Sequence, residues 1–418
     1  MIRRITVIAA IACASAQTRL PAWTAPRPNA SLPHGGFPVP AGLRHALIYN
    51  STPEVGTYNH AAMLTYHNGS FLLTFKNSPV DEDAPGQRVL YSTSTDGLLW
   101  SVVNTETVLF PNMSTSSNPA HLFAEPSIVI GDRLYAAASP IQFCLYPDEY
   151  ASVLLLRRVT LPADLGPVFW AGPVPPGFEE ASTLRGVSPL DQMDAVTRAD
   201  VAALLAPVTN VLPCDPLDGS AGGVRKCEAC VGGCQRWADI APGVLTLLAN
   251  ERTHFQRAAA AGGGVADDVL LYRSKANHFY ASVRTGGLNS TWSVPVVTDI
   301  PDDNSNLNAG TLPDGRVFLL SNSVQRPSLR DPITLALSRD GVSFDAAWAV
   351  VSCADLAVAP NVDPCTPRYK GEWKNPGPSY PQGVVMSAPA PAALRGLWIV
   401  HCNNKEDIWV SFVPERSV

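Results

Sequence analysis

Short apolar runs alternate with turn residues along most of the chain. The run Phe71–Phe75 follows the turn pair Asn68-Gly69, and similar runs flank Gly131-Asp132 and Asp314-Gly315. Such pairs tolerate the positive φ angles of a tight hairpin turn, and the flanking apolar residues suit the strands of a sheet. The pattern therefore predicts an all-β chain built from successive hairpins.

One turn motif occurs twice, far apart in the chain. It reads S-T-D-G-L-L-W at residues 94–100 and S-R-D-G-V-S-F at residues 338–344, and each copy follows an apolar run. In both copies the Asp can bond back to the backbone, the Gly supplies a positive φ angle, and the aromatic residue can fold under the turn. A degenerate third copy lies within residues 282–292. Repetition of one hairpin unit is typical of a β-propeller.

The motif spacing predicts the number of propeller blades. The aromatic positions 292 and 344 are 52 residues apart, which suits one four-stranded blade. Roughly 380 mature residues at about 60 per blade give six blades. We expect one six-bladed β-propeller over residues 43–418, preceded by a Pro-rich segment, residues 17–42, that is either a linker or a strand closing the ring.

One segment, about residues 185–236, breaks the strand pattern. Ser188-Pro189 precedes apolar positions with helical spacing, which predicts one helix of about 15 residues with Pro189 in its first turn. A Gly- and Cys-rich stretch follows. We interpret the segment as a small helical, Cys-rich insertion on one blade.

The first 16 residues are typical of a secretory signal peptide. Arg3 and Arg4 precede the apolar run Ile5–Cys13, and Ala14-Ser15-Ala16 has the form of a cleavage site. A lipoprotein cysteine at Cys13 is the alternative, although Ala10 stands where such a signal has Leu. We expect a secreted, extracellular protein.

Eight cysteines remain after Cys13, out of nine. An even number in a secreted chain predicts disulfide bonds, and sequence cannot choose among their pairings. The Cys227, Cys230 and Cys234 cluster could instead bind zinc, but no His lies near it, so we expect no metal and no cofactor. Five glycosylation sequons, which predict a glycoprotein, begin at Asn29, Asn50, Asn68, Asn112 and Asn289.

Charge excludes one class of partner. The net charge is −6, only 16% of residues are charged, and the chain has no basic run. Nucleic acid is therefore not an expected partner. Beyond the N-terminus no apolar stretch approaches the ~18 residues of a membrane span. We expect a monomer without a membrane span.

Several segments, together with the two turn motifs, resemble the sialidase (neuraminidase) superfamily, in particular its secreted proteins with BNR or Asp-box repeats. These segments are residues 83–94, 308–317, 322–332 and 405–408. They are spread over most of residues 45–412, outside the insertion. The resemblance implies the six-bladed propeller and an exo-acting glycosidase.

The resemblance also implies candidate site residues. Sialidases bind the substrate carboxylate with three arginines, and Arg330 and Arg252 match the third and the second. The first arginine is replaced by Tyr58-Asn59-His60-Ala61, where His60 is the candidate. Each residue also has a structural interpretation: Arg330 as an ion pair with Asp331, Arg252 as a solvated strand end, and His60 as a packed ring.

Two further candidates would carry the chemistry. Tyr380 matches the nucleophilic Tyr, and Asp83, eleven residues before Ser94, matches the acid/base Asp. Alternatively, Tyr380 is a packed residue at the ring closure and Asp83 belongs to a solvated acidic loop. No Glu precedes Arg252 where the family has the partner of its Tyr; Asp239 or Glu251 could substitute.

Two functional hypotheses remain open. In the first, the chain is a sialidase-like glycoside hydrolase that removes a terminal acidic sugar, most simply sialic acid, from a glycan, with a uronate-bearing or sulfated glycan as another substrate. In the second, it is a non-catalytic propeller that binds glycans or proteins. The incomplete arginine set and the missing Glu favour the second.

Overall fold

The fold was obtained as a computed structural model. It describes residues 19–82, 84–116, 120–142, 154–162, 164–205, 252–257, 266–274, 277–286, 290, 292–326 and 328–417. Within this part of the chain, nearly all regular structure is β-strand, which confirms the predicted all-β class.

Twenty-one strands form five sheets in the described residues. Each sheet contains four successive antiparallel neighbours, and one sheet gains a short fifth strand. The first sheet contains β3 (Tyr58–His67), β4 (Ser70–Ser78), β5 (Arg88–Ser94) and β6 (Val108–Phe110), and the second contains β7 (Ala120–Ile130), β8 (Arg133–Gln142), β9 (Leu155–Thr160) and β10 (Asp164–Trp170). The third contains β11 (Arg252–Arg257), β12 (Asp267–Tyr272), β13 (His278–Arg284) and β14 (Val296–Pro301), and the fourth contains β15 (Asn308–Thr311), β16 (Val317–Ser321), β17 (Ile333–Ser338) and β18 (Ser343–Val351), with β1 (Ala22–Trp23) beside β18. The fifth contains β19 (Pro378–Met386), β20 (Gly396–Asn403), β21 (Asp407–Pro414) and β2 (Arg44–Tyr49).

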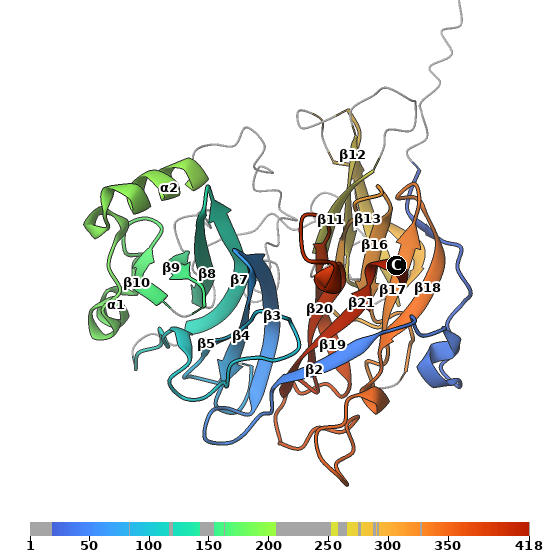
Figure 1. The fold of residues 1–418 in the computed structure, drawn as a ribbon, viewed down its shortest axis with the longest axis horizontal. Helices are drawn as coiled ribbons and strands as arrows, with labels where there is room; N and C mark the ends of the chain where they lie inside the picture. Colours follow the sequence, from blue (N-terminus) through green and yellow to red (C-terminus); the bar gives the residue numbers. More distant parts are fainter. Residues whose placement is uncertain are drawn as a thin grey trace, which may run out of the picture.

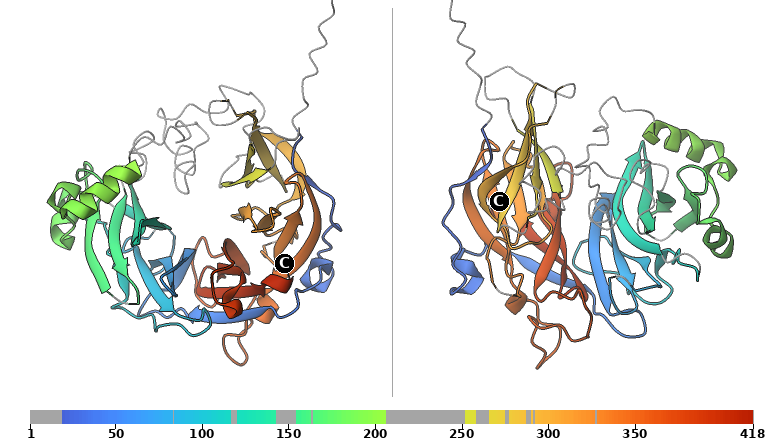
Figure 2. Two further views of the ribbon diagram at one scale, coloured as in Figure 1. Left: turned by 45° about the horizontal axis from the view of Figure 1, so that its top comes forward. Right: turned by 180° about the vertical axis from the view of Figure 1, so that it is seen from behind.

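The sheets are arranged as blades around a common centre (Figures 1 and 2). The first strands of neighbouring blades contact one another: β3 contacts β7 and β19, and β15 contacts β11 and β19. This arrangement confirms the predicted β-propeller. The described residues supply five blades, so the predicted total of six stays a prediction, because residues 206–250 lie outside them.

The ring is joined by strands from both ends of the chain. β2 pairs antiparallel with β21 and completes the blade that contains β19 and β20, so the unpaired edge of β21 is covered. The segment 17–42 was predicted to be a linker or the closing strand. The closing strand follows it, at Arg44–Tyr49, whereas Ala22 and Trp23 pair in parallel with the outer edge of β18.

The cores lie between adjacent blades. Strands β4 and β20 are buried at every residue, because both faces of each blade are covered. One apolar cluster joins the first and last blades through Phe71 and Trp398, whose ring centroids are 4.9 Å apart. Interblade packing therefore fixes how the ends of the strands meet.

Both copies of the turn motif have the predicted geometry. Asp96 Oδ1 accepts from the backbone N–H groups of Leu98 and Leu99, both at 2.8 Å. Asp340 Oδ1 does the same for Val342 and Ser343, also at 2.8 Å. Each turn joins the third strand of a blade to the segment that leads to its fourth, on the outside of the propeller, so the motif is structural.

The Gly of the first motif lies directly on the neighbouring blade. Gly97 has φ +74°, and a Cβ placed on it would lie 2.3 Å from the indole ring of Trp398. A side chain would therefore meet both a strained backbone and a rigid ring.

The insertion differs from its prediction. The structure has α1 (Glu179–Arg185), a 3-10 turn at Leu190–Gln192, and α2 (Ala195–Leu205). The predicted single helix starting at Pro189 is wrong, because the Asp194 side chain accepts from the Thr197 N–H at 2.9 Å and caps a helix that begins at Ala195. Residues 206–236 of the predicted insertion lie outside the described part.

Further 3-10 turns occur at Pro33–Gly36, Cys353–Asp355, Ala392–Leu394 and Glu415–Ser417. None of the described helices has the length and apolar character to cross a membrane.

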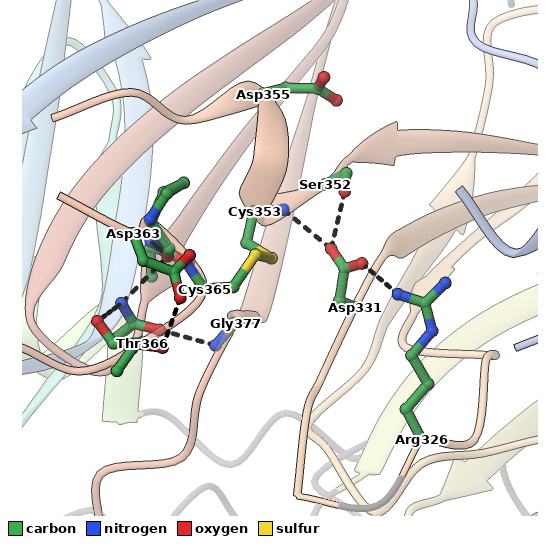
Figure 3. Close-up of a disulfide and its surroundings, with 12 residues drawn as sticks. Arg326, Asp331, Ser352, Cys353, Asp355, Asp363, Cys365, Thr366 and Gly377 are labelled. Atoms are coloured by element: carbon green, nitrogen blue, oxygen red, sulfur yellow. Dashed lines mark hydrogen bonds and ion pairs between the residues drawn. A yellow bond between two sulfur atoms is a disulfide. The ribbon is translucent and has the colours of Figure 1, made fainter. Parts of the chain in front are cut away.

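One disulfide, Cys353–Cys365, is present in the described residues (Figure 3). Cys402 is a buried free thiol beside Ser379, so the expectation that all eight cysteines are paired is wrong at this position. The Cys227, Cys230 and Cys234 cluster lies outside the described residues.

Candidate active site

The candidate site lies at one end of the ring, where loops from several blades converge. In an up-and-down blade, the start of the first strand and the connection between the second and third strands lie at the same end. That topology brings together the starts of β3 and β19 with the connections β4–β5, β12–β13, β16–β17 and β20–β21. Distant sequence segments therefore contribute to one cluster.

Tyr380 lies at the centre of this cluster. It belongs to β19 but has φ +59°, within an irregularity between Ser379 and Gln382. Only 4% of the surface of Tyr380 is exposed. Its hydroxyl accepts a hydrogen bond from Nη1 of Arg273 at 3.1 Å. A positive φ angle on a bulky residue is strained, and the blade packing must maintain it. The sequence placed Tyr380 in the site, and the structure surrounds it with cationic groups.

Arg330 is the second central residue and is buried beside Tyr380. Its Cζ lies 5.7 Å from the centroid of the Tyr380 ring, and its Nη2 donates to the Asn304 carbonyl at 2.8 Å. Burial lowers the pKa of the guanidinium. Nη1 of Arg330 is buried without a hydrogen-bond partner among the described residues. The predicted ion pair with Asp331 is not what the structure shows, since Asp331 pairs with Arg326 at 2.8 Å.

Arg273 was missed by the sequence reasoning. It directly follows the buried strand β12, and its Nε donates to Oδ1 of Asn304 at 2.8 Å. Asn304 therefore binds Arg273 with its side chain and Arg330 with its carbonyl. The available signal was an arginine directly after a fully apolar run, Val269–Tyr272.

His60 packs edge-on against Tyr380, with ring centroids 4.1 Å apart. It is 1% exposed and lies in β3 just before an irregularity in which Ala61 has φ +51°. His60 thus lies in the cluster, in contact with the ring of Tyr380, and its role in binding a carboxylate stays a prediction.

A buried ion pair adds a lysine and a carboxylate that the sequence reasoning also missed. Nζ of Lys405 lies 3.1 Å from Oε2 of Glu82, 5.5 Å from the Tyr380 ring centroid and 5.6 Å from that of Tyr58. Lys405 sits in the β20–β21 turn with φ +52°, which directs the chain back toward the centre. The resemblance included residues 405–408 but assigned no role to this lysine.

Four of the predicted residues have side chains outside the part of the chain that the structure describes. Asp83, Asp239 and Glu251 lie outside the described residues. Arg252 is the first residue of β11, where its backbone pairs with Tyr272, but its side chain lies outside the described part. The two residues that precede Asp83 in the sequence, Asp81 and Glu82, do lie in the cluster.

Two carboxyls follow β14 in the chain, and Asp302 is buried whereas Asp303 is half-buried. Burial raises the pKa of Asp302 to about 7 and that of Asp303 to about 7, and Arg330 opposes both shifts. Asp302 Oδ2 accepts from the Ser274 N–H at 2.9 Å, which fixes the turn after Arg273. No set of three His, Cys, Asp or Glu side chains suited to a metal ion occurs among the described residues.

The family models match two parts of the chain. A BNR repeat-like domain matches residues 262–390, and a model described as an N-terminal β-propeller matches residues 48–126. No curated protein matches the sequence.

Solved structures match almost the whole chain at low identity. A sialidase is 19% identical, with a TM-score of 0.66 over 95% of this chain and 35% of its own chain. A mutant Trypanosoma rangeli sialidase with trans-sialidase activity is 11% identical, with a TM-score of 0.48 over 90% of this chain and 60% of its own. The chain thus spans about a third of the first of these proteins and three fifths of the second.

These matches define the class of protein. The chain is a β-propeller whose fold is similar to that of a sialidase, and its residues 262–390 match a BNR repeat-like domain, in agreement with the resemblance of its turn motifs and segments.

Proposed function

We propose that the chain is a glycoside hydrolase of sialidase type that removes a terminal acidic sugar, most simply sialic acid, from a glycan. One observation carries the proposal: the hydroxyl of Tyr380 accepts from Arg273 and its ring lies beside the buried Arg330. Tyr380 also packs in the apolar cluster between blades, but packing alone does not explain a strained tyrosine with two guanidinium groups beside it. The sialidase fold supports the same reaction class.

Arg273 and Arg330 would hold the sugar carboxylate. A guanidinium presents parallel N–H donors that match a carboxylate, and such charge-assisted bonds are strong in a buried site. Nη1 of Arg330 is buried and has no partner in the described residues, so a carboxylate that reached it would satisfy an unpaired donor. Arg252 and His60, from the sequence prediction, would complete the contacts.

Tyr380 would attack the anomeric carbon, as tyrosine does in sialidases. Attack forms a bond from the phenolic oxygen to the sugar while the glycosidic bond breaks. Asp83 would give its proton to the departing oxygen and then take one from the water that releases the sugar. Neighbouring cations, Arg273 and Lys405, favour the phenolate over the phenol, which makes Tyr380 a better nucleophile.

A non-catalytic glycan-binding propeller is the second candidate. The observation that favours it is the packing of His60, rather than a third guanidinium, against Tyr380. Such a protein would bind the acidic sugar through the same arginines without turnover.

Hydrolysis of a fluorogenic α-sialoside, with a β-glucuronide beside it, tests the proposal. We expect release of sialic acid by the wild type and its loss, by roughly a thousandfold or more, in Tyr380→Phe, which keeps the ring but lacks the hydroxyl. Arg330→Ala should also lose turnover. No turnover of either sugar, with retained binding on a glycan array, would replace the hydrolase by the binding protein.

The cellular setting is a separate proposal. We infer that the chain is secreted as a glycoprotein, since its first 16 residues have signal-peptide form and Cys353–Cys365 is a disulfide. Mass spectrometry of protein from the culture medium tests this: an N-terminus at Gln17 is expected, and an intact Met1 in the medium contradicts it.

A further inference from the structure

A cavity of about 370 Å³ lies beside β6, the last strand of the first blade. Its walls come from the β2–β3 and β4–β5 connections, the start of β5, the strand β6 with the residues that follow it, and the end of α1. None of the candidate-site residues described above lines this cavity. The proposed hydrolysis therefore does not explain it.

The lining of the cavity is both apolar and polar. Prolines and valines, among them Pro111 and Val108, supply apolar surface. Arg88 and Arg185 supply hydrogen-bond donors, and Glu54 supplies an acceptor that offsets one of the two positive charges. Apolar walls with a few fixed polar groups suit a sugar, which has C–H faces as well as hydroxyl groups.

Both arginines have donors to spare. Arg88 is held by bonds from Nε to Asn77 Oδ1 at 2.9 Å and from Nη2 to the Val55 carbonyl at 2.8 Å. Arg185, the last residue of α1, donates from Nε to the Asn112 carbonyl at 3.0 Å. Neither arginine pairs with a carboxylate in the described residues, and Nη1 of Arg88 and both terminal nitrogens of Arg185 have no hydrogen-bond partner there.

The cavity is also lined by a glycosylation sequon. Asn112, in the sequon Asn112-Met113-Ser114, is one of its lining residues. Its Oδ1 accepts from the Ser114 N–H at 2.8 Å, so the amide oxygen is occupied by the local backbone. Its Nδ2, the atom that carries an N-linked glycan, has no partner among the described residues and is not one of their enclosed atoms. A glycan on Nδ2 would therefore break no existing contact.

We propose that Asn112 carries an N-linked glycan whose first N-acetylglucosamine residues fill this cavity. This inference rests on the proposal that the chain is a secreted glycoprotein. Arg88 and Arg185 would donate to hydroxyl and acetamido oxygens, and Glu54 would accept from a hydroxyl. Because the sugar is attached at the wall, its effective concentration in the cavity is high and a few contacts suffice to hold it. The glycan would link the first blade to α1 of the insertion.

Enzymatic release of glycans from the native protein tests this. The full-length protein is secreted from a host that adds high-mannose glycans, and peptide mass spectrometry follows each sequon during digestion with endoglycosidase H. This enzyme cuts between the first two sugars, so a core held in a cavity is protected. Asn68, in an exposed hairpin turn, is the internal control. We expect glycans at both sites, and release at Asn112 about tenfold slower than at Asn68, with no difference after denaturation.

Variants identify the groups that hold the glycan. Arg185→Ala should speed release at Asn112 about tenfold, as for the loss of one charged hydrogen bond, and leave release at Asn68 unchanged. Arg185→Lys, which keeps a donor, should retain part of the protection. Arg198→Ala, at an exposed arginine of α2, is the matched control and should change neither rate.

Failure of this inference can be distinguished from failure of the cellular setting. An unmodified Asn112 in a protein that is glycosylated at Asn68, or equal native release rates at the two sites, would overturn the cavity role and leave the glycoprotein proposal intact. Unchanged release in Arg185→Ala would likewise overturn it. A secreted protein without a glycan at any sequon would overturn both proposals.

Discussion

Arg273 donates from Nη1 to the hydroxyl oxygen of Tyr380 over 3.1 Å, although the two residues are 107 positions apart. Asn304, from a third segment, binds Nε of Arg273 at 2.8 Å and thereby sets the direction of the guanidinium. The tyrosine and its cation are therefore positioned jointly by two blades and by the connection between β14 and β15, which carries Asn304. A substitution of Arg273, or of Arg330 on the other side of the tyrosine ring, should reduce substrate binding more than folding stability.

Arg273→Lys tests this arrangement. Lysine keeps the charge but loses the fork that binds Asn304 and Tyr380 together. We expect kcat/KM on a sialoside to fall roughly 10- to 100-fold, as for the loss of one charged hydrogen bond. Arg316→Lys, on an exposed hairpin, is the control and should be neutral. Unchanged kinetics for Arg273→Lys would remove this residue from the site.

Asp302 should make stability depend on pH. Burial raises its pKa from 3.8 to about 7, so the folded state binds more protons than the unfolded state between these values. Its contribution to stability is therefore largest at low pH and declines as pH rises from about 4 to about 7, at up to ~1.4 kcal/mol per pH unit.

Urea unfolding at pH 5 and pH 8 measures this. Asp302→Asn should reduce the loss of unfolding free energy between the two pH values, whereas Asp345→Asn, at an exposed position, should not. The same pH dependence in wild type and Asp302→Asn would mean that Asp302 is not the responsible group.

Gly97→Ala should destabilise the propeller strongly. The new methyl group would lie 2.3 Å from the Trp398 ring, in addition to a backbone with φ +74°. Gly131→Ala is a matched control, because Gly131 has φ +62° but nothing lies within 4 Å of a Cβ there. We expect about 1 kcal/mol for Gly131→Ala from the backbone alone and several kcal/mol for Gly97→Ala. Equal losses in denaturant unfolding would show that the ring contact relaxes freely.

Replacing Cys353 and Cys365 by Ser should have two effects. Loss of a disulfide that closes a loop of this length costs about 3 kcal/mol. The bond also anchors the connection that leads into β19, so the double variant should become more susceptible to proteolysis between residues 356 and 377. Thermal unfolding and limited proteolysis measure these effects separately. Unchanged proteolysis would show that Glu406 and Asp81 suffice to hold the connection.

Local features of the fold were predictable from the sequence. The hairpins at Asn68-Gly69 and Asp314-Gly315 and both turn motifs depend on interactions within a few residues, and they form as predicted. The helix starting at Pro189 was mispredicted because the cap at Asp194 was overlooked. A closing strand was one of two alternatives for residues 17–42, but it lies just after them, at Arg44–Tyr49, because its position depends on pairing with β21, more than 350 residues away.

The site was only partly predictable. The resemblance named Tyr380, Arg330 and His60, and these three residues do lie together, while their roles stay predictions. Arg273 and Lys405 were not found, since an arginine after a strand and a lysine in a turn are ordinary at the level of sequence. Their proximity to Tyr380 follows only from the order of the blades around the ring.

The sequence by itself determined the repeated hairpin, the turn chemistry and hence the propeller class, because strand alternation and Asp-Gly turns are set by neighbouring residues. Tertiary structure alone decided which charges surround Tyr380, that Glu82 pairs with Lys405, and that the Trp373 backbone binds Asp81. These contacts join segments far apart in the chain, and only the packing of blades about a common centre fixes their distances.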